Sequence, residues 1–269
     1  MPEDDFEKTV TETILLHNFE AEETDEQSSD SPGTTVAPGG LDERLVVFHK
    51  PRSIESEYFR FLKNRIEQQL ETTRGNKGKV ILITGPSLGV GKTTCAVNLA
   101  MVFARSYGEK TLLLDADTRR GTSRKYLGIR DDNLPGLVDV ITRKKEISKV
   151  LFNTDLFDMV YFPSGDFTDA FIDDLRGKEL TSLMKNLKER FRYIIIDSPP
   201  AFPMPETAVI AQHCDGIILV LRAGRDGRDD LEQAKEALEG VNIMGVILNA
   251  VKAPPGQKYG AYGYYGKSS

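Results

Sequence analysis

The sequence predicts an α/β fold in which a mostly parallel, doubly wound sheet lies between two layers of helices. Six short runs are rich in Ile, Leu and Val along their whole length, as strands buried on both faces are; they are 80–84, 111–115, 159–163, 193–197, 216–221 and 244–249. Helical patterns separate most of them, at 92–106, 170–190, 206–213 and 229–239. Strands and helices that alternate in this way form right-handed βαβ units, and their ligands bind beyond the carboxyl ends of the strands.

The composition narrows the class of protein. A length of 269 residues fits one α/β domain with tails. A net charge of −6 argues against a nucleic-acid binder, which needs a basic surface. Cys95 and Cys214 lie in apolar runs without metal-ligand spacing, so we expect reduced core thiols in a cytoplasmic protein. Since neither a secretory signal nor about 18 consecutive apolar residues are visible, we expect membrane association only through a partner.

The two ends differ from the middle of the chain. Residues 1–44 are expected to form a disordered acidic segment, because 20–40 hold almost no large apolar residues. Within this segment, 10–19 fits at most a short amphipathic helix. The folded domain is predicted at 45–252 and includes a helix at 53–73 whose apolar residues recur every three or four positions. Residues 253–269 are predicted to be a flexible tail, and they include Tyr259, Tyr262, Tyr264 and Tyr265.

The strongest motif follows the strand at 80–84 and opens the helix at 92–106. A phosphate chain needs converging backbone N–H groups, and glycines allow the backbone to come close. The residues predicted to bind it are Gly85, Gly89, Val90, Gly91, Lys92, Thr93 and Thr94. Lys92 would reach the β- and γ-phosphates, and the Thr93 hydroxyl would bind Mg²⁺. The spacing departs from a strict P-loop, because Pro86 stands where the first glycine belongs.

Three aspartates stand at strand ends. Asp115 and Asp117 leave the run at 111–115, and Asp197 closes the run at 193–197. One of the first two is expected to hold the metal shell while the other accepts a proton from an attacking hydroxyl. Asp197 has the Walker B arrangement, in which a carboxylate orients Mg²⁺. Asn249 ends the last apolar run and either recognises an adenine edge or forms a turn.

Together these features resemble the bacterial tyrosine kinases of capsule and exopolysaccharide assembly, the CpsD/CapB family and the cytoplasmic half of Wzc-type proteins. The resemblance covers about residues 50–269. It includes a loosened Walker A motif at 85–93, Walker A′ at 112–119, Walker B at 194–200 and the tyrosine-rich end. Glu57, Arg60 and Lys63 resemble the Glu-x-x-Arg-x-x-Arg oligomerisation helix, with lysine in place of the last arginine. The fold implied is the P-loop NTPase fold of the SIMIBI, MinD-like class.

The resemblance also implies an activity and partners. It implies an ATP- and Mg²⁺-dependent protein-tyrosine autokinase that phosphorylates the four tail tyrosines, mostly between subunits of a ring, and regulates polysaccharide synthesis and export. Lys92, Asp115, Asp117 and Asp197 would be catalytic, with Asp117 as base; Thr93, Asp115 and Asp197 would hold the metal. The expected partners are a separate membrane-bound activator, or polysaccharide co-polymerase, and a phosphotyrosine phosphatase.

Two other functions compete with the kinase. ParA/MinD-type positioning ATPases carry a second lysine five residues before the P-loop lysine, where this sequence has Ser87. The C-terminus also lacks the basic amphipathic helix expected for membrane docking. A nucleotide-dependent scaffold without catalysis is the third hypothesis, and the intact Lys92 and carboxylates argue against it. The kinase is therefore the favoured reading.

Overall fold

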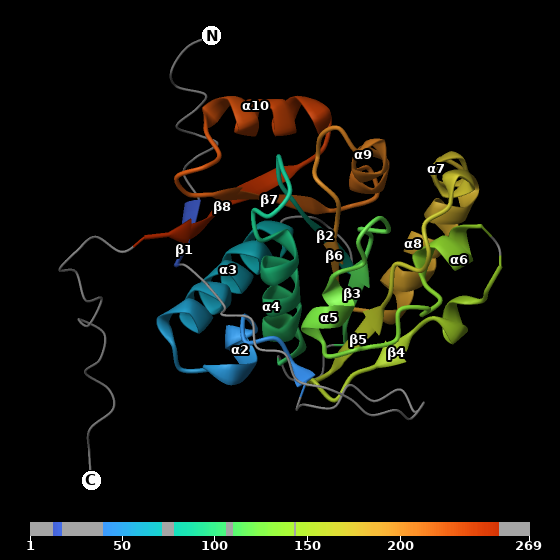
Figure 1. Ribbon diagram of the computed structural model, residues 1–269, viewed down its shortest axis with the longest axis horizontal. Coiled ribbons are helices and arrows are strands. Elements are labelled where there is room, and N and C mark those ends of the chain that lie inside the picture. The colour runs from blue at the N-terminus through green and yellow to red at the C-terminus, as the bar shows by residue number, and fades with distance from the viewer. Residues whose placement is uncertain (1–12, 18–39, 72–77, 106–109, 143, 253–269) are drawn as a thin grey trace.

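A parallel sheet forms the centre of the molecule. The computed structural model describes residues 13–17, 40–71, 78–105, 110–142 and 144–252 (Figure 1). Within these ranges the sheet has eight strands in the order β1-β8-β7-β2-β6-β3-β5-β4. Only the pair β4–β5 is antiparallel among them. The strands are β1 Thr13–His17, β2 Lys79–Thr84, β3 Thr111–Asp115, β4 Phe152–Asn153, β5 Met159–Phe162, β6 Tyr193–Asp197, β7 Gly216–Arg222 and β8 Ile243–Val251.

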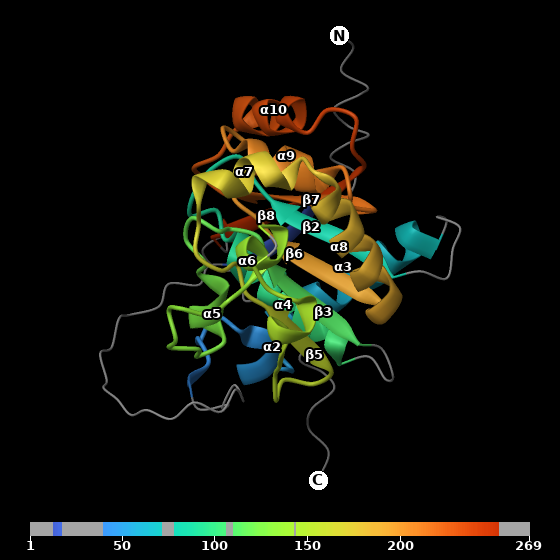
Figure 2. The same cartoon turned by 90° about the vertical axis from the view of Figure 1, so that its right-hand side faces the viewer.

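Helices cover both faces of this sheet. The described helices are α2 Val46–His49, α3 Ile54–Glu71, α4 Lys92–Ala104, α5 Ser123–Tyr126, α6 Leu137–Ile141, α7 Asp169–Leu175, α8 Lys178–Arg190, α9 Pro205–Ala211 and α10 Arg228–Ala237, with a 3₁₀ turn at Ile147–Lys149. Side chains of β2 alternate between two cores: Ile81 and Ile83 pack with α2, α3 and α4, while Val80 and Leu82 pack with α6 to α10. Figure 2 shows the second layer from its own side, with α7 and α8 in front of the sheet. The predicted three-layer, doubly wound class is confirmed.

The strand order positions the site. β2 lies between β7 and β6, and β6 lies between β2 and β3. Because these strands are parallel, the loop after β2 and the carboxyl ends of β3 and β6 meet at one edge of the sheet. In this register Asp197 is the partner of Asp115 on one side and of Ile83 on the other. The predicted strand-end aspartates therefore lie beside the glycine-rich loop.

Two predicted elements, the helix at 170–190 and the short helix at 10–19, differ from the structure. The single helix expected at 170–190 is two helices, α7 and α8, because Gly177 has an extended backbone and its N–H donates to Asp174 O at 2.9 Å. The step from Leu175 to Leu180 is five residues, which breaks the helical phase of the buried side chains. The sequence did not reveal this break, since apolar residues continue on both sides of it.

The N-terminal prediction also needs correction. Where a short helix was expected at 10–19, the structure has strand β1, which extends the sheet by pairing in parallel with β8. Leu41 is buried in the core, so the folded part begins before residue 45. The rest of the predicted disordered segment, 1–12 and 18–39, and the predicted tail at 253–269 lie outside the described residues.

Candidate active site

The glycine-rich loop joins β2 to α4 and adopts a phosphate-binding shape. Gly89 and Gly91 have left-handed backbones, with φ of +72° and +99°. A Cβ at Gly91 would lie 2.0 Å from Asn249 Nδ2, so a side chain has no room there. No side chain caps the N-terminus of α4, which leaves its first N–H groups available to an anion. The Thr94 hydroxyl lies 3.1 Å from the Tyr126 hydroxyl, in hydrogen-bond contact with it.

Lys92 is a buried cation at the centre of the site. Only 6% of it is exposed, and its Nζ donates to Ser87 O at 3.2 Å. Burial lowers the pKa of Lys92, while the negative charges of Asp197 and Asp117 oppose that shift. No ion pair to Lys92 is found in the part of the chain that the structure describes. Its charge is thus left for a ligand of opposite sign.

Asp115 and Asp197 lie side by side at the ends of β3 and β6, both fully buried. Asp115 accepts hydrogen bonds from the backbone N–H of Asp117 at 3.0 Å and of Ser123 at 3.2 Å, and from the Ser123 hydroxyl. Burial raises the pKa of Asp115 to about 7, and the Ser123 hydroxyl opposes that rise. Neither carboxylate oxygen of Asp197 has a hydrogen-bond partner within the described residues.

The surroundings of Asp197 disfavour the ionised form of its carboxyl group. Burial raises its pKa well above the usual range, and the charge of Asp115 adds to the rise. The Thr93 hydroxyl, which lies near Asp197 but does not meet hydrogen-bond geometry, and the positive charge of Lys92 lower it in part. Two buried, unpaired oxygens cost free energy unless a cation or a donor satisfies them. The site is therefore arranged for a ligand that brings positive charge.

Asp117 has a second carboxylate near it that the sequence analysis did not assign. Burial raises the pKa of Asp117, Lys92 and Arg120 lower it, and the charge of Glu206 raises it again. Glu206 in the first turn of α9 is 1% exposed, and its Oε1 accepts from Arg119 Nε at 2.9 Å. Its Oε2 is buried without a partner among the described residues. The sequence signals were an acidic residue directly after Pro205, at a helix start, and its place about where the resembled kinase family usually has an aspartate.

Asn249 and the P-loop hold each other in place. Its Nδ2 donates to Val90 O at 2.8 Å, and its Oδ1 accepts the N–H of Ala250 at 2.8 Å. The amide therefore braces the loop from β8. Recognition of adenine by Asn249 stays a prediction. Gly85 is also tightly placed, because a Cβ there would lie 2.3 Å from Val220 O.

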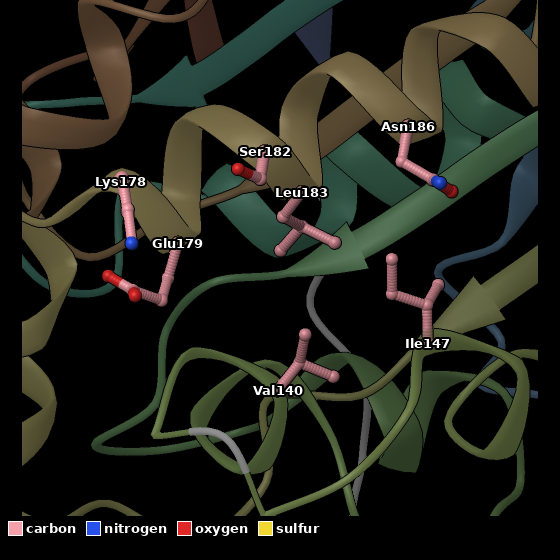
Figure 3. Close-up of a pocket in the computed structure, with 7 residues that line it drawn as sticks. All are labelled: Val140, Ile147, Lys178, Glu179, Ser182, Leu183 and Asn186. Carbon is pink, nitrogen blue, oxygen red and sulfur yellow. The ribbon is translucent and has the colours of Figure 1, made fainter.

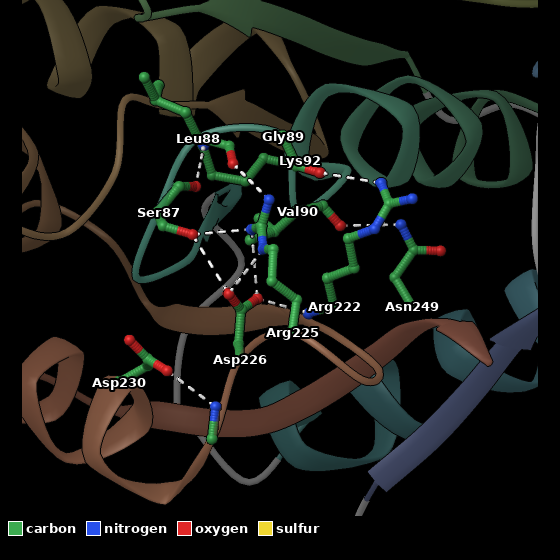
Figure 4. A network of polar contacts seen from close by, with 11 residues as sticks. Ser87, Leu88, Gly89, Val90, Lys92, Arg222, Arg225, Asp226, Asp230 and Asn249 are labelled. Atoms are coloured by element: carbon green, nitrogen blue, oxygen red, sulfur yellow. Dashed lines mark hydrogen bonds and ion pairs between the residues drawn. The ribbon is translucent and has the colours of Figure 1, made fainter.

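The loop between β7 and α10 contacts the P-loop as well, which the sequence analysis did not foresee (Figure 4). Arg225 donates to Leu88 O at 2.9 Å and to the Ser87 hydroxyl at 2.7 Å. Arg222 donates to Gly89 O at 3.3 Å. Motif spacing could not predict these arginine contacts, since the arginines and the P-loop are more than 130 residues apart in sequence.

The remaining predicted residues lie elsewhere. Glu57 and Arg60 form an ion pair of 2.6 Å on α3, and Lys63 pairs with Glu67 at 2.8 Å. Phe61 on the same helix is 56% exposed. The four tail tyrosines are outside the described residues. A separate pocket of about 390 Å³ lies between α6 and α8, and none of the predicted site residues line it (Figure 3).

Comparison with known proteins identifies the family. Residues 78–242 match the family model described as AAA domain. The chain is 34% identical over 212 residues to the tyrosine-protein kinase CpsD of Streptococcus pneumoniae, and the match covers 78% of this chain and 90% of that protein. The chain belongs to this bacterial tyrosine-kinase family. The predicted resemblance is thereby confirmed.

Solved structures separate this kinase from the rival ATPases. The BceF tyrosine kinase domain superposes with a TM-score of 0.69 at 27% identity, over 78% of this chain and 84% of that one. The MinD protein of Pyrococcus horikoshii in complex with Mg-ADP gives a TM-score of 0.56 at 25% identity, over 66% of this chain and 74% of that one. The kinase domain is the better match. Of the helices described, none has the length and apolar character to cross a bilayer.

Proposed function

We propose that the kinase transfers the γ-phosphoryl group of ATP to tyrosines of its own C-terminal segment, Tyr259, Tyr262, Tyr264 and Tyr265. The observation that carries this proposal is the convergence of one buried cation, Lys92, with the buried carboxylates of Asp115, Asp117 and Asp197 at the end of the P-loop. Phosphoryl transfer depends mostly on positioning and on charge stabilisation, and this arrangement supplies both.

Magnesium fits the donors present. The Thr93 hydroxyl is near Asp197, whose two buried oxygens lack partners among the described residues. Asp115 is the third candidate and acts through the metal's water shell. No group of three or more acidic, His or Cys ligands is found in the described ranges. Mg²⁺ takes one or two carboxylates, waters and substrate phosphates, and Asp197 and Asp115 would supply the carboxylates. When bound, the ion neutralises charge on the transferred phosphoryl group.

Asp117 is the proposed general base. The phenolic oxygen of the acceptor tyrosine forms a bond to the γ-phosphorus while the bond to the β,γ-bridging oxygen breaks, and the phenolic proton passes to the Asp117 carboxylate. Burial raises the pKa of Asp117, which makes its ionised form a stronger base than an exposed aspartate. Arg119, held by Glu206, keeps the chain beside Asp117 in place. Lys92 binds the phosphates of ATP.

The wider role follows the family resemblance. The kinase domain is proposed to run from about residue 40, since Leu41 joins the core, to residue 252. Helix α3 is proposed to join subunits into a ring through Glu57, Arg60 and Lys63. A separate membrane-bound activator, a polysaccharide co-polymerase, is the proposed partner that brings a cytoplasmic kinase to the membrane. A phosphotyrosine phosphatase would reverse the reaction, and the protein would regulate exopolysaccharide or capsule synthesis and export.

Incubation with Mg-ATP tests the proposal, with phosphate located by mass spectrometry. Phosphate on the tail tyrosines that is lost in Lys92→Met supports the kinase. ATP hydrolysis without phosphotyrosine would instead favour the positioning ATPase. The absence of both activities, with nucleotide still bound, would favour the scaffold.

A further inference from the structure

Arg225 is held in one orientation against the P-loop (Figure 4). Its Nη1 donates to Leu88 O at 2.9 Å, its Nη2 to the Ser87 hydroxyl at 2.7 Å, and its Nε to Asp226 Oδ1 at 3.0 Å. An arginine fork with three separate acceptors has little rotational freedom left. The guanidinium is therefore held in position by contacts within the protein itself.

Asp226 fixes the base of this arrangement. Its side chain is 4% exposed, and its Oδ2 accepts the backbone N–H of Arg222 at 2.6 Å. Its Oδ1 also lies 3.3 Å from the Ser87 hydroxyl, which donates to it. Asp226 is thus committed to the β7–α10 loop and to Ser87. It anchors Arg225 through Nε and, at 3.4 Å from its Oδ2, through Nη2, while Nη1 and Nη2 also donate to Leu88 and Ser87 of the P-loop.

Two cations, Lys92 and Arg225, both donate to Ser87 of the P-loop. Lys92 donates to the carbonyl of Ser87, while Arg225 donates to the hydroxyl of Ser87 and to the carbonyl of Leu88. Both side chains are cations held against Ser87, so their positive charges repel each other. Repulsion of this kind is removed when an anion binds between them. A polyphosphate is the anion that this loop is built to hold.

Room exists for a phosphate oxygen at Arg225. The side chain is 42% exposed. Its Nη1 lies 3.5 Å from the place where a Cβ of Gly89 would be, over a residue without a side chain. Nη1 carries two N–H groups, and only one of them is used within the described residues. One donor is therefore available without breaking the existing contacts.

We propose that Arg225 is a catalytic residue that binds the terminal phosphate of ATP from the β7–α10 loop of the same chain. Bidentate or charge-assisted contacts from arginine stabilise the charge on the equatorial oxygens as the phosphoryl group passes to the acceptor. Arg225 takes up no proton and forms no covalent bond. This inference rests on the proposed kinase function and adds a residue to it.

A purely structural role for Arg225 predicts a different result. If it only braces the P-loop, its loss would weaken the binding of ADP and of ATP equally, because both nucleotides use the same loop. A contact to the γ-phosphate instead changes the affinity for ATP and leaves the affinity for ADP nearly unchanged. Arg222 is the matched control, since its Nη1 also donates to a loop carbonyl, that of Gly89 at 3.3 Å.

The experiment compares Arg225→Ala, Arg225→Lys and Arg222→Ala with the unchanged chain. Calorimetry gives the affinities for Mg-ADP and for a non-hydrolysable Mg-ATP analogue, and phosphotyrosine formation gives kcat. Because hydrogen bonds between charged groups are strong, Arg225→Ala should lower the affinity for the ATP analogue about 10-fold. It should change the affinity for ADP by less than about 2-fold. Its kcat should fall by at least about 10-fold. Arg225→Lys keeps the charge without the fork and should recover ATP affinity in part.

Arg222→Ala should change the affinities for ADP and for the ATP analogue by the same factor. An equal loss of ADP and ATP affinity in Arg225→Ala, or no loss of either, overturns the inference. Thermal unfolding shows whether each variant is folded, and Arg225→Lys tests the same contact if Arg225→Ala is not. If the unchanged chain binds both nucleotides but forms no phosphotyrosine, the kinase proposal fails, while the ratio of affinities still decides the role of Arg225.

Discussion

At the scale of single residues, Asp197 illustrates how the site trades stability for chemistry. Its carboxylate is fully buried with both oxygens unpaired in the described structure. Burial and Asp115 raise its pKa well above that of an unfolded chain. A raised pKa means that the folded state binds more protons than the unfolded state. The free energy of unfolding therefore decreases as pH rises through the folded pKa values.

Asp197→Asn should show this trade directly. Without nucleotide, the variant should be more stable than the unchanged chain at pH 8, by about 1–3 kcal/mol, because a buried charge is removed. The difference should shrink towards pH 5, where Asp197 binds a proton. Chemical denaturation at both pH values measures it. Kinase activity should be lost. Asp173→Asn, at an exposed position, is the control; equal behaviour of the two variants would contradict the argument.

Gly91→Ala is expected to separate backbone strain from steric exclusion. Gly91 has a φ of +99° and lies against Asn249, whereas Gly240 has a φ of +82° with nothing near its Cβ position. Gly240→Ala should cost about 1–2 kcal/mol of stability and leave nucleotide binding intact. Gly91→Ala should cost more and abolish binding, since the P-loop must move. Denaturation and nucleotide titration check both. If the two variants retain nucleotide equally, the close contact with Asn249 has no importance for the site.

Much of the candidate site could be predicted from the residue types in the sequence. The positions of a lysine that follows a glycine-rich loop and of aspartates at strand ends can be predicted from the sequence. The reason is that parallel strands end at a common edge. Glu206, Ser123 and Arg225 could not be predicted in this way. Each acts on a residue that is distant in sequence, such as Asp115 for Ser123 or Leu88 for Arg225. Such contacts arise from loop packing, which leaves no periodic signal.

At the scale of elements, long buried strands were predictable and short helices were not. The runs at 111–115 and 193–197 match β3 and β6, because strands buried on both faces are apolar throughout. Helices α5 and α6 have four and five residues, too few for an apolar period to repeat. β1 was also missed, because its assignment depends on pairing with β8, 226 or more positions later.

The helix α3 gives a prediction at this scale. Glu57→Ala with Arg60→Ala removes an exposed ion pair, and such pairs contribute little to stability, about 0–1 kcal/mol. Folding should therefore persist while the assembly dissociates, with later elution in size-exclusion chromatography. Lys63→Ala removes the neighbouring pair with Glu67, whose side chains are more buried. It tests whether the lysine shares the interface. A double variant that elutes unchanged would exclude Glu57 and Arg60 from the contact.

At the scale of the whole molecule, the strand order decides where the chemistry occurs. β2, β6 and β3 are neighbours in the sheet although they are separated in sequence, and this brings Lys92 beside Asp115 and Asp197. The sequence predicts parallel βαβ units but does not specify which strands are adjacent. The position of the proposed active site is therefore a property of topology, and under the proposed function the tail tyrosines would reach it from beyond β8.

A mixing experiment determines which subunit's edge they reach. One variant carries Lys92→Met and keeps its tyrosines, and the other is active but has Phe at 259, 262, 264 and 265. Thirteen residues separate Asn249 from Tyr262, at most about 45 Å when extended, so distance permits transfer within one chain or between two. If transfer occurs between subunits, mixing should produce phosphotyrosine on the Lys92→Met chain, at a rate that rises with concentration. Adding Glu57→Ala and Arg60→Ala to both chains should reduce this rate. A Lys92→Met chain that stays unmodified in the mixture, while the unchanged protein phosphorylates itself at a concentration-independent rate, would place transfer within a single chain.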